Sequence, residues 1–129
     1  MRTNIKVLAI FGAVALMAAE SISIAAEAGE LRVRCERRGN KRSKVSVDGR
    51  DVAPGTYVIQ LTSGANTATQ VTKIVVAPAD EFEADYDSNR ADIRAGATAI
   101  GRTFIQNGAV SVAVTGPENL SANVSCTVR

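Results

Sequence analysis

Oxygen-bearing side chains recur at alternate positions in one short stretch, Asp85-Tyr-Asp-Ser-Asn89, and Asp92 follows nearby. This D-x-D-x-N spacing is that of the first three ligands of calcium loops. The stretch departs from an EF-hand, since Arg90 stands where that loop needs glycine and Gly96 where it needs glutamate. The alternative interpretation is an acidic, solvated strand face that discourages aggregation. The candidate ligands of calcium or another hard cation are Asp85, Asp87, Asn89 and Asp92.

Basic side chains are concentrated in segment 32–44. An anionic polymer, a membrane surface or an acidic protein partner would contact such a patch electrostatically. Aromatic residues are not interleaved with it, so the sequence gives no specific nucleic-acid signal. Alternatively, the segment is a solvated edge and turn, or it meets the acidic segment 80–92 within one molecule or between molecules. The candidate contacts are Arg34, Arg37, Arg38, Lys41, Arg42 and Lys44.

Catalytic chemistry has few candidate residues in this chain. It contains no histidine, which excludes a Ser-His-Asp or Cys-His arrangement. Carboxylates two apart on one strand point the same way, whereas glycosidase carboxyls face each other across a cleft. We therefore expect a protein that is not an enzyme and that holds no cofactor apart from the calcium considered above.

The N-terminus has the layout of a secretory signal peptide, with Arg2 and Lys6 preceding the apolar run 7–19. This run is shorter than the roughly 20 residues that a membrane-spanning helix needs. Small residues then suit cleavage after Ala25, or as late as Ala28. We expect a signal peptide at 1–25, a single domain at 29–129 and a secreted or periplasmic location without a membrane anchor. An uncut anchor helix is the alternative.

The only two cysteines, Cys35 and Cys126, lie in stretches where apolar residues alternate with polar ones. Exported cysteines tend to pair, so we predict a disulfide that ties the first strand to the last. Two free, buried cysteines are the alternative. Alternation through 120–128 predicts one continuous strand with Val128 on the same face as Cys126.

Short alternating segments separated by turn residues fill the rest of the chain. We expect a tight turn at Asp48-Gly49, a strand at 81–87 with an acidic outer face, and a helical turn within 89–95. Asn107-Gly108 predicts a hairpin between strands 102–106 and 109–114. Seven or eight such strands predict an all-β, antiparallel sandwich or barrel.

The stretch Pro54-Gly-Thr-Tyr57, followed by alternating apolar residues, resembles a strand opening of immunoglobulin-like and fibronectin-type domains of secreted bacterial proteins. The resemblance implies an immunoglobulin-like β-sandwich and no particular activity. We therefore expect a non-catalytic binding or structural module. The alternatives are a calcium-binding domain that uses segment 80–92 and a cell-surface or matrix adhesion module that uses segment 32–44.

Overall fold

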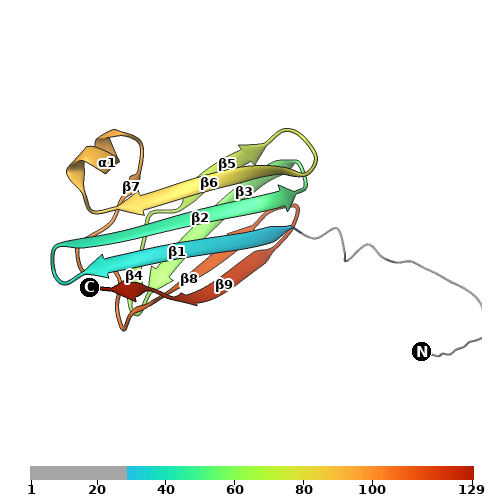
Figure 1. Cartoon of the computed structure of the whole chain (residues 1–129). Helices are drawn as coiled ribbons and strands as arrows, with labels where there is room; N and C mark the ends of the chain where they lie inside the picture. The colour runs from blue at the N-terminus through green and yellow to red at the C-terminus, as the bar shows by residue number, and fades with distance from the viewer. Residues whose placement is uncertain (1–28) are drawn as a thin grey trace, which may run out of the picture.

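The computed structural model describes residues 29–129, and the predicted signal peptide lies outside the described residues. The strands form two sheets that lie one over the other (Figure 1). Sheet A has the strand order β10-β1-β2-β6-β7, with the bounds β1 Glu30–Arg38, β2 Arg42–Val52, β6 Asp80–Asp87, β7 Thr98–Ala99 and β10 Thr127–Val128. Sheet B consists of β3 Gly55–Ser63, β4 Asn66–Thr67, β5 Val71–Val75, β8 Ala109–Thr115 and β9 Leu120–Ser125, with β4 and β5 both paired to β3. The prediction of an all-β protein is confirmed.

The core lies between the two sheets because strand alternation directs every second side chain inward. Sheet A contributes buried side chains from β2 and β6, and sheet B contributes them from β3 and β8. The rings of Tyr57 on β3 and Phe82 on β6 join the layers, with their centroids 5.3 Å apart. Burying each large apolar side chain contributes about 1.5–3 kcal/mol, so this layer is the main stabilising element.

The strand β2 is longer than the sequence predicts. Asp48 and Gly49 lie inside it, opposite Arg32 and Leu31 of β1, so the predicted tight turn at these residues is wrong. Phe82 explains the glycine, since a Cβ at Gly49 would lie 2.3 Å from its ring. The glycine therefore makes room for a core aromatic ring rather than for a turn.

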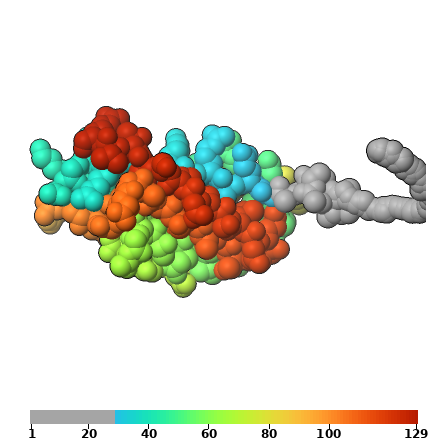
Figure 2. All heavy atoms as spheres, turned by 90° about the horizontal axis from the view of Figure 1, so that it is seen from below, coloured from blue at the N-terminus to red at the C-terminus, as the bar shows by residue number. Residues whose placement is uncertain are grey.

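The last strand changes sheets at Cys126. Residues of β9 pair with β8 in sheet B, whereas β10 pairs in parallel with β1 in sheet A. The predicted disulfide is confirmed: Cys126 is bonded to Cys35 of β1, with 4.8 Å between their Cα atoms. Figure 2 shows the dark red residues of the C-terminal strands running between β1 in blue and β8 in orange. One continuous strand was therefore the wrong prediction, and Val128 is 62% exposed.

The segment before β8 is irregular. Asn107 and Gly108 form the predicted turn with positive φ angles, but only one bridge, between Gln106 and Ala109, precedes β8. The predicted strand 102–106 is therefore wrong. Its carbonyl groups instead accept hydrogen bonds from side chains of other strands, and Phe104 and Ile105 are buried. The predicted helical turn is confirmed as α1, Arg90–Arg94.

Candidate functional site: a cationic groove on sheet A

Charged side chains cover the outer face of sheet A. They alternate with the core residues along each strand. The outward positions are even-numbered on β1 and β2 and odd-numbered on β6. The outward positions of β1 are mainly basic and those of β6 are acidic, with β2 between them. The sheet therefore brings the predicted basic and acidic segments together on one face, as one of the sequence-based alternatives proposed.

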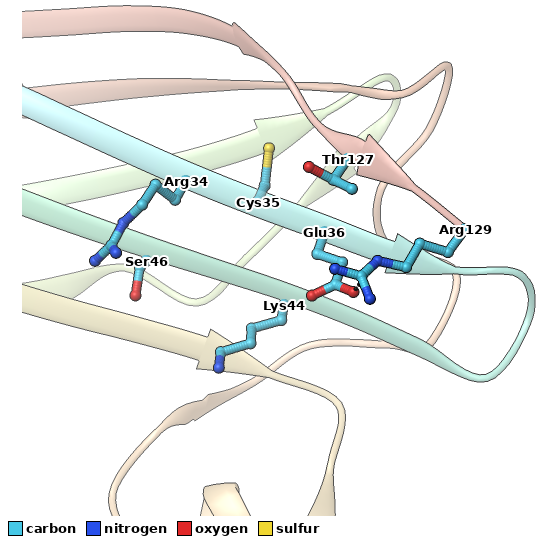
Figure 3. A pocket seen from close by; sticks show the side chains of 7 residues that line it. All are labelled: Arg34, Cys35, Glu36, Lys44, Ser46, Thr127 and Arg129. Carbon is cyan, nitrogen blue, oxygen red and sulfur yellow. Dashed lines mark ion pairs between the residues drawn. The ribbon is translucent and has the colours of Figure 1, made fainter.

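An open groove of about 370 Å³ lies on this face where β1, β2 and β10 run side by side (Figure 3). The pairing register sets its geometry, because Glu36 of β1 lies opposite Lys44 of β2 and Thr127 of β10. Arg34 lies opposite Ser46 in the same way. The residues that line the groove are Arg34, Cys35, Glu36, Lys44, Ser46, Thr127 and Arg129.

The groove carries more positive than negative charge. It is lined by three cationic side chains, Arg34, Lys44 and Arg129, and by a single carboxylate, Glu36. Glu36 accepts a hydrogen bond from Nε of Arg38 at 3.0 Å, and it forms an ion pair with Nε of Arg129 at 3.1 Å. The hydrogen bond from Arg38, together with the nearby positive charges, lowers the pKa of Glu36. This carboxylate is thus ionised at neutral pH and compensates only part of the surrounding positive charge.

Two cations of the groove remain largely available to a ligand. Arg34 is 69% exposed and makes only a long contact of 3.4 Å with Asp48. Lys44 is exposed and makes no ion pair within residues 29–129. Exposed ion pairs contribute about 0–1 kcal/mol, so an anion can replace the Arg34 contact at little cost. The arrangement suits electrostatic binding of an anionic group.

The other predicted basic contacts have different roles. Arg37 donates to the carbonyl oxygens of Gly39 and Ile105, at 2.7 and 2.6 Å, and so fastens the β1–β2 turn to the segment before β8. Lys41 is exposed in that turn, and Arg38 lies beside Glu36. Of the six predicted contacts, Arg34 and Lys44 line the groove, while Arg37 and Arg42 are held by internal hydrogen bonds.

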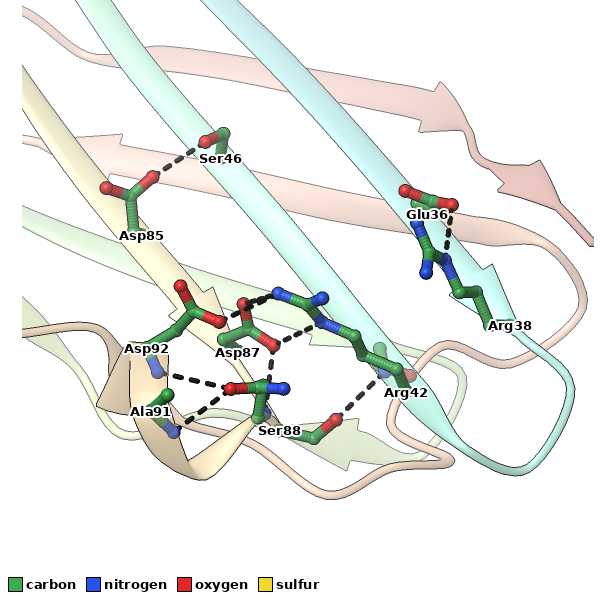
Figure 4. Close-up of polar contacts among 11 residues, drawn as sticks. Glu36, Arg38, Arg42, Ser46, Asp85, Asp87, Ser88, Ala91 and Asp92 are labelled. Atoms are coloured by element: carbon green, nitrogen blue, oxygen red, sulfur yellow. Dashed lines mark hydrogen bonds and ion pairs between the residues drawn. The ribbon is translucent and has the colours of Figure 1, made fainter. Parts of the chain in front are cut away.

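Arg42 lies in a partly buried polar cluster at the end of β6 (Figure 4). It donates through Nε and Nη2 to the two carboxylate oxygens of Asp87, at 3.0 and 2.7 Å, and through Nη2 to Asp92 at 2.9 Å. Burial raises the pKa of Asp87, but the hydrogen bonds from Arg42 and from the Asn89 amide outweigh burial, so the pKa of this carboxyl is lowered. The bidentate bond to Asp87 raises the pKa of Arg42.

The four candidate calcium ligands already bond to protein groups. Asp87 and Asp92 share Arg42, and the Oδ1 atom of Asn89 accepts from the amides of Ala91 and Asp92 at the start of α1. Asp85 accepts from the hydroxyl of Ser46 at 2.6 Å, on the exposed part of the sheet. In residues 29–129 no group of three or more His, Cys, Asp or Glu side chains is arranged to hold a metal ion. Calcium binding therefore stays a prediction.

The expected acidic outer face of β6 is confirmed for Glu81, Glu83 and Asp85, which are exposed, but not for Asp87, which is buried. The reason is that Arg42 and α1 cover the end of the strand.

Thr127 and Arg129 are the groove residues that the sequence-based prediction missed. They lie beside β1 because β10 pairs with it and because the Arg129 amide donates to the Arg37 carbonyl at 2.9 Å. The disulfide was the available signal, since a bond between Cys35 and Cys126 places the residues after each cysteine side by side.

Comparisons with known proteins add no family. The chain matches no protein-family model, no curated protein and no solved structure. Within the described part of the chain, no helix has the length and apolar character needed to cross a membrane.

Proposed function

We propose that this protein is a non-catalytic, extracytoplasmic module with an immunoglobulin-like β-sandwich fold that binds an acidic polysaccharide through the groove on sheet A. The observation that carries the proposal is the groove itself, which is lined by Arg34, Lys44 and Arg129 and by only one carboxylate. Its open shape suits a chain that passes along the surface. Adhesion to a cell surface or an extracellular matrix would use the same contacts.

Several features support the location and the fold. The disulfide between Cys35 and Cys126 is of the kind that persists in oxidising compartments. The N-terminal charge and hydrophobicity pattern is that of an exported protein. Two face-to-face sheets of mainly antiparallel strands, joined where the last strand changes sheets, are compatible with an immunoglobulin-like arrangement.

A polysaccharide suits the groove better than a nucleic acid does. Proteins that bind single-stranded nucleic acids stack the bases on aromatic side chains. The aromatic side chains within residues 29–129, Tyr57, Phe82, Tyr86 and Phe104, are all buried. Sulfate and carboxylate groups need no stacking surface and are recognised by charge and hydrogen bonds alone.

Heparin chromatography tests the proposal, with heparin as the sulfated polysaccharide. The groove variant Arg34→Ser/Lys44→Ser/Arg129→Ser is compared with the control Arg90→Ser/Arg94→Ser/Arg102→Ser, which removes the same charge from exposed positions outside the groove. We expect the wild type and the control to elute at a higher salt concentration than the groove variant. Equal elution of the two variants would contradict the proposed groove, and no retention of the wild type would contradict polysaccharide binding.

A further inference from the structure

The outer face of sheet B has the opposite chemistry from that of sheet A. Its outward positions alternate with the buried residues of β3 and β8 and the partly buried ones of β9, and none of them is charged. They are Thr56, Val58, Gln60 and Thr62 on β3, Thr67 on β4, Thr72 and Ile74 on β5, Ala109, Ser111, Ala113 and Thr115 on β8, and Ser121, Asn123 and Ser125 on β9. We call these residues the neutral face.

The outer face of sheet A, in contrast, is almost entirely charged. Among the outward positions of β1, β2 and β6, every residue except Ser46 is charged. Charged surfaces keep proteins apart, whereas a surface without charge lacks this repulsion and favours association. Among the outward strand positions of the two sheets, charge is confined to sheet A, so the neutral face is the surface on which two molecules would repel each other least.

The neutral face also has an apolar margin. Ile74 of β5 is 70% exposed, and Val76, which follows that strand, is 82% exposed. Small side chains lie opposite one another in the inner part of the face, such as Ala113 beside Ser121 and Ser111 beside Thr62. Small residues leave a flat surface on which another sheet can pack at about 10 Å.

We propose that the neutral face binds the neutral face of a second copy of this chain and forms a two-fold symmetric dimer. A two-fold contact brings the same patch of both copies together, so any net charge on the patch would repel itself. The neutral face avoids this repulsion entirely. A sugar ligand is less well suited, because the aromatic side chains of residues 29–129 are buried and provide no stacking surface here.

The size of the face sets the expected strength of the dimer. Seven residues of β8 span about 23 Å, and four strands span about 19 Å, so the flat area is of the order of 440 Å² per copy. Stable interfaces bury about 800 Å² per partner. We therefore expect a weak dimer that dissociates on dilution, with the two charged outer faces directed away from each other.

Sedimentation equilibrium over a range of concentrations tests the proposal, using protein produced from the full coding sequence in an oxidising compartment. Ala113→Lys places a charge at the centre of the neutral face, and Ser46→Lys places the same charge on the outer face of sheet A as a matched control. We expect the dissociation constant to rise at least about tenfold for Ala113→Lys and to stay within about twofold for Ser46→Lys. High salt should leave the wild-type dimer intact, because the contact contains no charge pairs.

Three results would overturn the proposal. The wild type could remain monomeric at every concentration, Ala113→Lys could dimerise like the wild type, or high salt could dissociate the dimer, which would indicate contact through the charged face instead. If Ala113→Lys does not fold, Ser121→Lys on β9 is the second variant, since Ser121 is exposed and lies opposite Ala113. Heparin retention is measured separately, so failure of the dimer leaves the groove proposal open to its own test.

Discussion

Removing the disulfide should cost this protein a large part of its stability. The double substitution Cys35→Ala/Cys126→Ala opens a loop of 91 residues between the two ends of the domain. Closing a loop of this length reduces the entropy of the unfolded chain by an amount equivalent to about 4.5 kcal/mol at 25 °C. A small domain has a total stability of about 5–15 kcal/mol, so the double variant should be close to its folding threshold.

Urea unfolding under non-reducing conditions measures this loss. We expect a fall of about 3–5 kcal/mol in the free energy of unfolding, together with a larger m-value, because the unfolded chain without the crosslink exposes more surface. Val124→Ala on β9 is the control, because it removes a partly buried side chain that packs on the core near Cys126 and leaves the crosslink in place. That variant should lose only about 1–2 kcal/mol with an unchanged m-value.

A loss below about 1 kcal/mol in the double variant would refute this reasoning. It would mean that the ends of the unfolded chain stay close together without the bond, or that β10 contributes little to the fold. The amides of Gly39 and Arg129 report on the second case, because they form the hydrogen bonds that hold the chain end against β1. Their hydrogen exchange should become faster in the double variant.

Four further predictions follow from single contacts. Tyr86→Phe should leave the free energy of unfolding unchanged or raise it by up to about 1 kcal/mol, because the buried Tyr86 hydroxyl has no partner among the described residues. Tyr57→Phe should lower it by about 1 kcal/mol, because the hydrogen bond to the Ala53 carbonyl is lost. Urea unfolding compares the two variants. Asp87→Asn should cost about 3 kcal/mol at pH 7, measured in the same way. The pKa of Asp87 in the folded protein lies below the ordinary 3.8, so the carboxylate stabilises the fold at neutral pH and this stabilisation is lost as the pH falls through 3.8 and below. The stability of Asp87→Asn should therefore depend less on acid pH than that of the wild type. Millimolar calcium should leave the melting temperature unchanged, as the candidate carboxylates already bond to protein groups. Gly49→Ala should cost about 1–3 kcal/mol in urea unfolding, because its methyl group would meet the ring of Phe82.

These predictions have matched controls. Asp85→Asn removes an exposed carboxylate from the same strand as Asp87, and it should cost much less stability at pH 7 than Asp87→Asn does. Gly101→Ala places a methyl group in open space and should be almost neutral. A calcium-dependent rise in melting temperature would support the metal-site interpretation. Equal losses in the two tyrosine variants would show that the Tyr86 hydroxyl has a partner.

The buried environment of Tyr86 keeps its phenol group protonated. Burial raises the pKa of Tyr86 to about 12, so the phenol is neutral throughout the range in which the protein would work. Tyr86 therefore acts as a core side chain, and the alternation of Phe82, Ala84 and Tyr86 was sufficient to predict that position.

The sequence by itself determined the features that depend on local pattern or on cysteine pairing. Alternation identified the inward residues of β6 and the all-β class, because each strand must bury one face. The two cysteines predicted the crosslink between the first strand and the last, since the sequence contains no third cysteine with which either could pair. The Asn107-Gly108 turn was predicted from its residue types, because this pair tolerates the positive φ angles that the structure shows there.

Tertiary structure alone decided which charges are available. Arg42 and Arg34 belong to the same basic segment, yet Arg42 is bound by Asp87 and Asp92 while Arg34 is exposed in the groove. A sequence does not reveal this difference, because a bidentate ion pair depends on residues brought together from strands far apart in the chain. Gly49 was misread for the same reason, as the ring of Phe82 that requires it comes from another strand. Strand pairing also gathered the charged outward positions of the strands on sheet A and left those of sheet B neutral, because the register of each strand decides which side chains share a surface.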